Sequence, residues 1–206
     1  DLSVSPPPDR LTEHPDYFGN RASYLETRTP HTEFEVTCRS TVEVDWPAPD
    51  LAALDQWSVA GAAAHAGSAD PLLLADFTMP SPQVALGDEV RAYARGELDG
   101  DRPLGEALDG LCRRIHHDFD YRTDTTSVAT TLAELLELRS GVCQDFAHLA
   151  VACLRSAGLP ARYVSGYLET DPPPGAEKLR GADASHAWAS VLTPLGWVDL
   201  DPTNAQ

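Results

Sequence analysis

A cysteine, a histidine and an aspartate in the second half of the chain could together perform nucleophilic chemistry. Cys143 opens an apolar segment with helical spacing, residues 143–157, which Gly158 and Pro160 close as stop signals. The first N–H groups of a helix have no partner inside the helix and carry partial positive charge, so a thiol there is biased toward the nucleophilic thiolate. A cysteine nucleophile also needs a base within hydrogen-bonding reach and a group that orients the base. The chemistry therefore requires a histidine and a carboxylate near Cys143.

Two strand-like segments near the end of the chain supply both groups. Residues 186–192 and 196–200 are typical of an antiparallel hairpin with a tight turn. Side chains alternate between the two faces of a strand, so an even number of loop residues puts His186 on the same face as Asp199 and Asp201. His186 and Asp201 would then be opposite or diagonal neighbours, roughly 5 to 8 Å apart at Cβ. Alternation does not decide whether Asp199 or Asp201 is the partner of His186, although Asp201 ends its strand next to a proline.

The segments between residue 80 and this hairpin are expected to be mostly helical, with one further strand. The expected elements are helices at residues 84–97, 103–119, 132–138 and 143–157, and a strand at 161–170. The clearest apolar stripe lies in 103–119, where the apolar side chains recur at helical spacing. Thr130 or Thr131 is expected to cap the helix at 132–138, with Glu134 in its first turn.

The first part of the chain is expected to form a separate, β-rich region. Residues 33–46 alternate apolar and polar side chains, as in a long half-buried strand, and residues 16–20 are typical of a turn. Residues 50–80 are rich in alanine and less regular. The expected division is therefore a β-rich region at 1–80 and a core at 81–206.

Composition narrows the class of protein and of partner. The 206 residues carry 15 Lys and Arg against 32 Asp and Glu, a formal net charge of −17, which argues against nucleic acid or an anionic membrane surface as partner. No run approaches the roughly 18 apolar residues that cross a bilayer, and the start shows no secretory signal. Four scattered cysteines do not form a disulfide framework, so the cytoplasm is the expected compartment. We expect Cys38, Cys112 and Cys153 to be small core residues.

Four blocks of the second half resemble the bacterial transglutaminase-like proteins, whose Cys-His-Asp arrangement is papain-like. The blocks are residues 141–148 (GVCQDFAH), 160–167 (PARYVSGY), 185–189 (SHAWA) and 196–204 (GWVDLDPTN), in the family's order. Each block alone is a weak signal, and together they are a strong one. The first part of the chain also resembles, more loosely, the β-rich region that precedes the core in many members. The resemblance implies an α+β fold with helices packed on an antiparallel sheet and the nucleophile at a helix N-terminus.

The resemblance also implies roles for individual residues. Cys143 would be the nucleophile, His186 the general base and acid, and Asp201, rather than Asp199, the orienting carboxylate. The family's reaction is acyl transfer from an amide through a thioester that water or an amine resolves. We expect hydrolysis of a protein, peptide or small amide substrate, because nothing in the sequence specifies an amine acceptor, and transglutaminase activity is the alternative within this class. Tyr167 and Trp188 are candidates for lining the acyl site, with buried packing as the other interpretation, and no cofactor or metal is expected.

Two hypotheses other than a cysteine acyl-transfer enzyme remain open. The chain could be a catalytically silent interaction domain that retains the fold. It could also be a zinc-binding module with Cys143, His186 and Asp201 as ligands, since these residue types bind zinc. Retention of all three residue types lowers the odds of the silent domain.

Other histidines and the end of the chain have simpler interpretations. His148 is expected to be a structural side chain with a local hydrogen bond, and Asp145 to serve the N-terminal turn of the cysteine helix. His116 and His117 are adjacent and face different directions on a helix, so we interpret them as C-terminal cations rather than as metal ligands. Members of the family usually continue with further strands, so either the chain is trimmed after residue 206 or it lacks those strands and Asp201 lies close to a frayed terminus.

Overall fold

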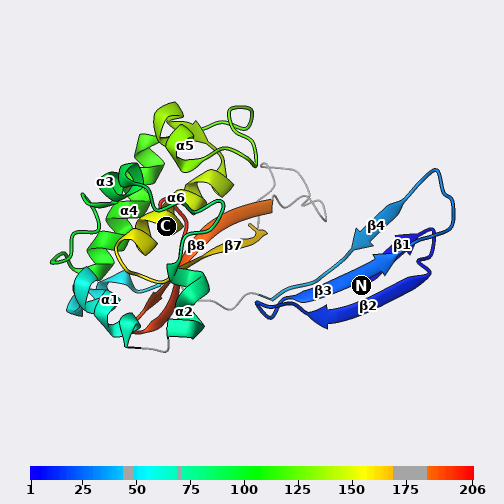
Figure 1. Cartoon of the computed structure of the whole chain (residues 1–206), viewed down its shortest axis with the longest axis horizontal. Coiled ribbons are helices and arrows are strands. Elements are labelled where there is room, and N and C mark those ends of the chain that lie inside the picture. The colour runs from blue at the N-terminus through cyan, green and yellow to red at the C-terminus, as the bar shows by residue number, and fades with distance from the viewer. Residues whose placement is uncertain (44–48, 69–70, 169–184) are drawn as a thin grey trace, which may run out of the picture. The chain divides into compact units, whose positions relative to one another are not determined.

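The chain forms two compact units, each of which is described by itself. The computed structural model describes residues 1–43, 49–68, 71–168 and 185–206 (Figure 1). The contacts divide the chain into Asp1–Pro47 and Ala48–Gln206. The division lies earlier than the boundary expected at residue 80, because the helices within residues 51–67 pack against a later helix of the second unit.

The first unit consists of two two-stranded antiparallel sheets. Strands β1 (Leu2–Ser5) and β4 (Glu35–Cys38) form one, and β2 (Arg10–Pro15) and β3 (Arg21–Glu26) form the other. The expected turn at residues 16–20 joins β2 to β3. There the Asp16 carboxylate accepts hydrogen bonds from the N–H groups of Phe18 and Asn20, and Gly19 adopts a φ of +84°. A glycine suits this position because it has no Cβ to clash in the left-handed region.

The long strand expected at residues 33–46 is much shorter in the structure. β4 ends at Cys38, the following residues to 43 are not in a strand, and residues 44–46 lie outside the described residues. Val36 is 45% exposed and Cys38 is exposed, so the prediction that Cys38 is a core residue is wrong. The physical reason is that β4 has a single partner strand, and a two-stranded ribbon offers too little sheet to bury an apolar face.

The second unit begins with helices, of which the sequence predicts the last four but neither of the two at residues 59–78, where a loop in a β-rich region was expected. They are η1 (Leu51–Gln56, a 3-10 helix), α1 (Val59–Gly67), α2 (Pro71–Thr78), α3 (Asp88–Ala94), α4 (Leu104–Asp118), α5 (Leu132–Leu138) and α6 (Cys143–Ser156). Thr131 caps α5 and forms the expected capping box with Glu134. α3 covers only the middle of residues 84–97, because the backbone at Gly87 is still extended and the helix begins after it.

A three-stranded antiparallel sheet completes the second unit. Strands β7 (Ala161–Tyr167), β8 (Ser185–Thr193) and β9 (Gly196–Leu200) lie in the order β7-β8-β9, and α6 packs against β8 and β7 (Figure 1). A separate parallel pair joins β5 (Asp120–Tyr121) to β6 (Ser140–Gly141). Helices packed on an antiparallel sheet with Cys143 at the start of a helix confirm the expected α+β fold.

The core of the second unit is built around α4 and α6. The apolar stripe of α4 is buried, with Leu104, Leu108 and Leu111 fully inaccessible to solvent. Cys112 and Cys153 are buried as expected, and burial raises the pKa of each thiol to about 12, so neither is a reactive thiolate. No helix in the described ranges is long and apolar enough to span a membrane.

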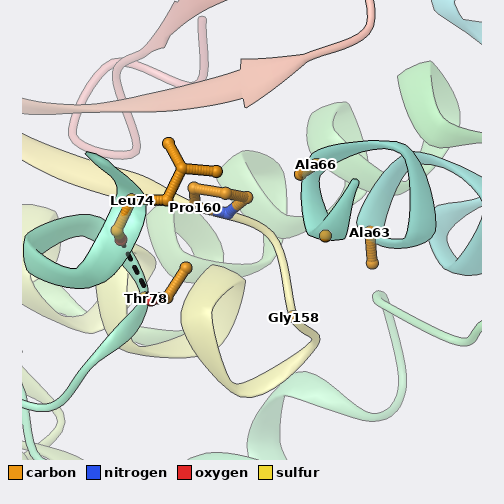
Figure 2. A pocket seen from close by; sticks show the side chains of 7 residues that line it. Ala63, Ala66, Leu74, Thr78, Gly158 and Pro160 are labelled. Atoms are coloured by element: carbon orange, nitrogen blue, oxygen red, sulfur yellow. Dashed lines mark hydrogen bonds between the residues drawn. The ribbon is translucent and has the colours of Figure 1, made fainter. Parts of the chain in front are cut away.

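A small apolar pocket lies away from the predicted site residues. It is bounded by α1, α2 and the turn from α6 to β7, and is lined by Ala63, Ala66, Gly67, Leu74, Thr78, Gly158 and Pro160 (Figure 2). The hydroxyl of Thr78 donates a hydrogen bond to the Leu74 carbonyl oxygen within α2. The one polar side chain among these lining residues is therefore already satisfied, and the side chains of the pocket offer a ligand mainly hydrocarbon contact.

Candidate active site

A short parallel strand pair fixes the backbone immediately before Cys143. β5 and β6 pair so that Tyr121 lies opposite Gly141, and the Arg122 N–H donates to the Gly141 carbonyl oxygen at 2.9 Å. Arg139 adopts a left-handed φ of 53°, which ends α5 and turns the chain into β6. α6 then begins at Cys143, so the thiol lies on the first residue of a helix whose approach path is held by a neighbouring strand.

Asp145 stabilises the first turn of the cysteine helix, as expected. Its side chain is buried, at 5% exposure, and accepts hydrogen bonds from the Val142 N–H at 2.9 Å and the Thr126 hydroxyl at 2.7 Å. In the described part of the chain, the N–H of Cys143 has no acceptor of its own. This N–H therefore remains free at the positive end of the α6 dipole, beside the sulfur.

His186 is hydrogen-bonded to Asp201. Its Nε2 lies 2.8 Å from Asp201 Oδ2, and the histidine is 8% exposed. β8 and β9 pair from Thr193 opposite Gly196 to Ala189 opposite Leu200, so the loop contains two residues, an even number. His186 therefore lies on the same face as Asp201 and diagonal to it.

The register also separates the two candidate aspartates. Asp199 pairs with Ser190 on β8 and is exposed, further from the start of that strand. Asp201 follows the last paired residue of β9 and bonds the imidazole directly. Of the two, Asp201 is the carboxylate that contacts His186.

The Asp201 carboxylate is held by its own turn. Oδ1 accepts the N–H groups of Thr203 at 2.9 Å and Asn204 at 3.3 Å, and Oδ2 accepts the Asn204 side-chain amide at 2.6 Å. An ionised carboxylate only accepts hydrogen bonds, so the His186 nitrogen that faces Asp201 carries the proton. Nε2 is therefore assigned as the donor. Nδ1 of His186 is then the nitrogen left to act as a base.

His116 contacts this turn, and the sequence does not reveal that contact. It lies in the last turn of α4, and its Nδ1 is 2.8 Å from the Thr203 carbonyl oxygen. Its neighbour His117 is 89% exposed in its side chain, with Asp118 3.4 Å away. The sequence predicts His116 only as a cation at the helix C-terminus. It does not reveal the contact with Thr203, because 87 residues separate the two.

Cys143 and His186 lie on packed elements, α6 and β8, but no hydrogen bond joins them in the described residues. Hydrogen bonds between a nucleophile and its base are often long in the unliganded state and shorten when substrate binds. We therefore expect Cys143 and His186 to come into direct contact when substrate binds.

The two aromatic candidates for the acyl site differ in their surroundings. The ring of Trp188 stacks near His186, with 6.2 Å between ring centroids and 25° between planes. Gly166 pairs with His186, and a Cβ at Gly166 would meet the Trp188 ring at 2.5 Å, so the glycine makes room for the indole. Tyr167 is 76% exposed at the end of β7. Of the two, Trp188 is the one with a ring contact to the imidazole.

Two tyrosines approach the Cys143 sulfur. Burial, the charge of Cys143 and a hydrogen bond to it raise the pKa of Tyr121, and burial with the charges of Cys143 and Asp145 raises that of Tyr163. In the sequence, only its place shortly after α4 distinguishes Tyr121. Reasoning from the sequence therefore did not identify it as a neighbour of Cys143.

His148 packs against one of these tyrosines. Its ring stacks on Tyr163 at 4.7 Å, and burial lowers the pKa of His148. The predicted local hydrogen bond of His148 is absent from the described structure, so this contact is a ring stack instead. The physical reason is that β7 places an aromatic ring beside the helix face that carries His148.

Sequence comparison identifies the family of this chain. The model of the transglutaminase-like superfamily matches residues 91–202, which include Cys143, His186 and Asp201. The chain belongs to the transglutaminase-like superfamily. The model of the bacterial transglutaminase-like N-terminal region matches residues 1–43 of the first unit.

Relatives of this transglutaminase-like chain are longer than it is. An uncharacterized protein of Mycobacterium tuberculosis is 46% identical over 215 residues, which cover 100% of this chain and 67% of that protein. The protein-glutamine gamma-glutamyltransferase of Pseudomonas aeruginosa is 35% identical over 125 residues, covering 58% of this chain and 18% of that protein.

Solved structures agree with the fold. The crystal structure of a putative cysteine protease from Cytophaga hutchinsonii matches 100% of this chain and 65% of its own, with a TM-score of 0.68 and 21% identity. The periplasmic domain of TgpA from Pseudomonas aeruginosa matches 67% of this chain and 49% of its own, with a TM-score of 0.50 and 27% identity. The chain thus spans less than two thirds of these solved neighbours.

Proposed function

We propose that this transglutaminase-like chain is a cysteine-dependent acyl-transfer enzyme that acts on amide bonds, chiefly by hydrolysis. The observation that carries the proposal is the His186–Asp201 hydrogen bond of 2.8 Å on the sheet that packs against the helix of Cys143. A thiol at a helix start, an imidazole and an orienting carboxylate are the parts that cysteine nucleophilic catalysis needs.

The first half of the reaction forms a thioester. His186 Nδ1 takes the proton of the Cys143 thiol, and the sulfur attacks the amide carbonyl carbon, so an S–C bond forms. The C–N bond then breaks as the imidazolium gives its proton to the leaving nitrogen, which departs as ammonia or an amine. Asp201 holds the ring and stabilises its positive charge.

The second half releases the acyl group. His186 takes a proton from water, and the water oxygen attacks the thioester carbon. The S–C bond then breaks as the imidazolium returns its proton to the sulfur, which gives a carboxylic acid and the free cysteine. The free N–H of Cys143 is a candidate donor to the carbonyl oxygen as negative charge develops on it. Trp188, stacked near His186, and Tyr167 are the side chains we propose for the acyl side of the site.

Amine transfer is the second candidate reaction. The curated relative from Pseudomonas aeruginosa is named a protein-glutamine gamma-glutamyltransferase, and in such a reaction an amine takes the place of water at the thioester. Water is present in large excess, and no side chain of the described site identifies an amine acceptor, so hydrolysis remains the favoured outcome. Ammonia release with and without an added primary amine, together with mass spectrometry of the acyl product, separates the two reactions.

The selective reactivity of Cys143 tests the proposal. Iodoacetamide at neutral pH should alkylate Cys143 faster than the exposed Cys38, and should leave buried Cys112 and Cys153 unmodified. Cys143→Ala should abolish turnover of a glutamine-peptide and amide library, whereas the matched variant Cys38→Ala should retain it. Equal labelling of Cys143 and Cys38, or activity that survives Cys143→Ala, would count against the enzyme.

The other readings have less support. Across the described ranges, no three His, Cys, Asp or Glu side chains are arranged to hold a metal ion, so the zinc module lacks a donor set there. A silent interaction domain would leave the hydrogen-bonded His186–Asp201 pair without a use, and unchanged biological output from Cys143→Ala would favour it.

The compartment is also a proposal. We propose the cytoplasm because all four cysteines are free thiols, although the solved TgpA relative is a periplasmic domain. Cell fractionation followed by detection of the native protein distinguishes the two locations.

A further inference from the structure

Tyr121 lies beside the start of the cysteine helix, held by two independent contacts. Its backbone belongs to β5, where it pairs with Gly141, two residues before Cys143. Its ring meets Phe146 edge to face, with 6.3 Å between centroids. Phe146 follows Cys143 by three residues, and residues three apart share one face of a helix. The Tyr121 ring therefore runs along the face of α6 that carries the sulfur.

From this position Tyr121 interacts with Cys143. Burial, the charge of Cys143 and a hydrogen-bonding interaction with its side chain raise the pKa of Tyr121. A raised pKa means that the tyrosine keeps its proton, so the hydroxyl is the donor and the sulfur the acceptor. This direction favours a charged sulfur, because hydrogen bonds to ionised groups are stronger than those to neutral ones.

The other groups around Cys143 do not supply this bond. Tyr163 on β7 interacts with Cys143 through charge alone. On α6 itself, Asp145 is occupied by Val142 and Thr126.

The two histidines of this neighbourhood are also engaged elsewhere. The ring of His148 on α6 stacks on Tyr163, and Nε2 of His186 on β8 bonds Asp201. Among these described neighbours, Tyr121 is therefore the neutral side chain that can donate to the sulfur.

We propose that Tyr121 is a further catalytic residue, whose hydroxyl donates a hydrogen bond to the Cys143 sulfur and stabilises its thiolate. Tyr121 forms and breaks no covalent bond and keeps its proton throughout. The donated bond favours ionisation of the thiol before attack, and it favours departure of the sulfur as a thiolate when water resolves the thioester. This inference rests on the proposed function, since it assigns a role in that same reaction.

Alkylation as a function of pH tests the inference without a substrate. Cys143 labelling by iodoacetamide is followed by mass spectrometry from pH 5 to 10 in the full chain. Tyr121→Phe keeps the ring against Phe146 and removes only the hydroxyl. We expect the midpoint of the labelling curve to move up by about one pH unit in this variant, a tenfold loss of thiolate at a given pH below it. The midpoint is the readout because a more basic thiolate is also intrinsically more nucleophilic, which partly masks a change in a single rate.

Tyr163→Phe is the matched control, because it removes a hydroxyl from the same neighbourhood that has no hydrogen bond to the sulfur. Its labelling curve should coincide with that of the unaltered chain. Identical midpoints for Tyr121→Phe and the unaltered chain, or equal shifts in both tyrosine variants, would overturn the role of Tyr121 while leaving the proposed function intact. Failure of Cys143 to react faster than Cys38 in the unaltered chain would overturn both.

Discussion

His186 and Asp201 are joined at 2.8 Å although they are not directly paired across the sheet. The last pair between β8 and β9 is Ala189 with Leu200, so the hydrogen bond runs diagonally beyond the end of the ladder. The carboxylate reaches the ring because the turn after β9 holds both of its oxygens. The pair therefore depends on both the register of the hairpin and the geometry of this turn.

Removing the charge of Asp201 should damage turnover more than folding. Asp201→Asn retains a side chain of the same shape but weakens the hold on the Nε2 tautomer, and a comparable change in a serine enzyme lowers kcat by about 10⁴-fold. We expect a loss of several orders of magnitude in kcat, measured on the best amide substrate. Asp199→Asn is the control, because Asp199 is exposed and lies only two residues before Asp201, and it should stay within twofold of the unaltered chain. Similar losses in both variants would argue against a specific role for Asp201.

His116 should act on turnover through the position of Asp201. His116→Ala removes the bond to the Thr203 carbonyl oxygen, which we expect to cost about 1 kcal/mol of folding stability and to lower kcat severalfold with little change in KM. His116→Asn, which offers a donor near the Nδ1 position, should restore part of kcat. The adjacent His117→Ala, on an exposed side chain, should change neither quantity. A fall in stability without any change in kcat would limit His116 to a structural role.

Gly166 should not tolerate a larger side chain. In Gly166→Ala the added Cβ would lie 2.5 Å from the Trp188 ring, so the indole or the strand must shift. We expect a loss of about 1–3 kcal/mol in chemical denaturation and reduced turnover, because Trp188 stacks on His186. Gly67→Ala, where a Cβ meets no atom within 4 Å, is the matched control and should be neutral. Unchanged stability of Gly166→Ala would mean that the ring moves aside freely.

His148 should make the fold less stable in mild acid. Burial lowers the pKa of His148 in the folded chain below the ordinary 6.5, so the unfolded chain binds the proton more readily. The stability that neutral His148 contributes to the fold is present above pH 6.5. It is lost as the pH falls through that value toward the lower pKa of the folded chain. Melting curves at pH 8 and pH 5.5 should show a smaller drop in Tm for His148→Gln than for the unaltered chain. His65→Gln, on an exposed histidine of α1, should leave the drop unchanged.

Local signals determined most elements of the second unit. Thr131 with Glu134 begins α5, and Gly158 with a φ of +81° follows the end of α6, so both helix limits are readable from a few adjacent residues. The two-residue turn of the β8–β9 hairpin has the even parity that puts His186 and Asp201 on one face. These features follow from backbone chemistry within a few positions, and local sequence contains that chemistry.

Tertiary structure decided what depends on distant neighbours. The alternation at residues 33–46 does not reveal that β4 finds only one partner strand, so the exposure of Cys38 had to come from the fold. The bond from His116 to Thr203 and the approach of Tyr121 to Cys143 join segments separated by many residues. Sequence alone therefore proposed Cys143, His186 and Asp201 by type and order, whereas the packing of α4 and β5 around them determined which other side chains reach the site. The physical reason is that side-chain direction follows from local periodicity, but contact requires two elements to meet in space.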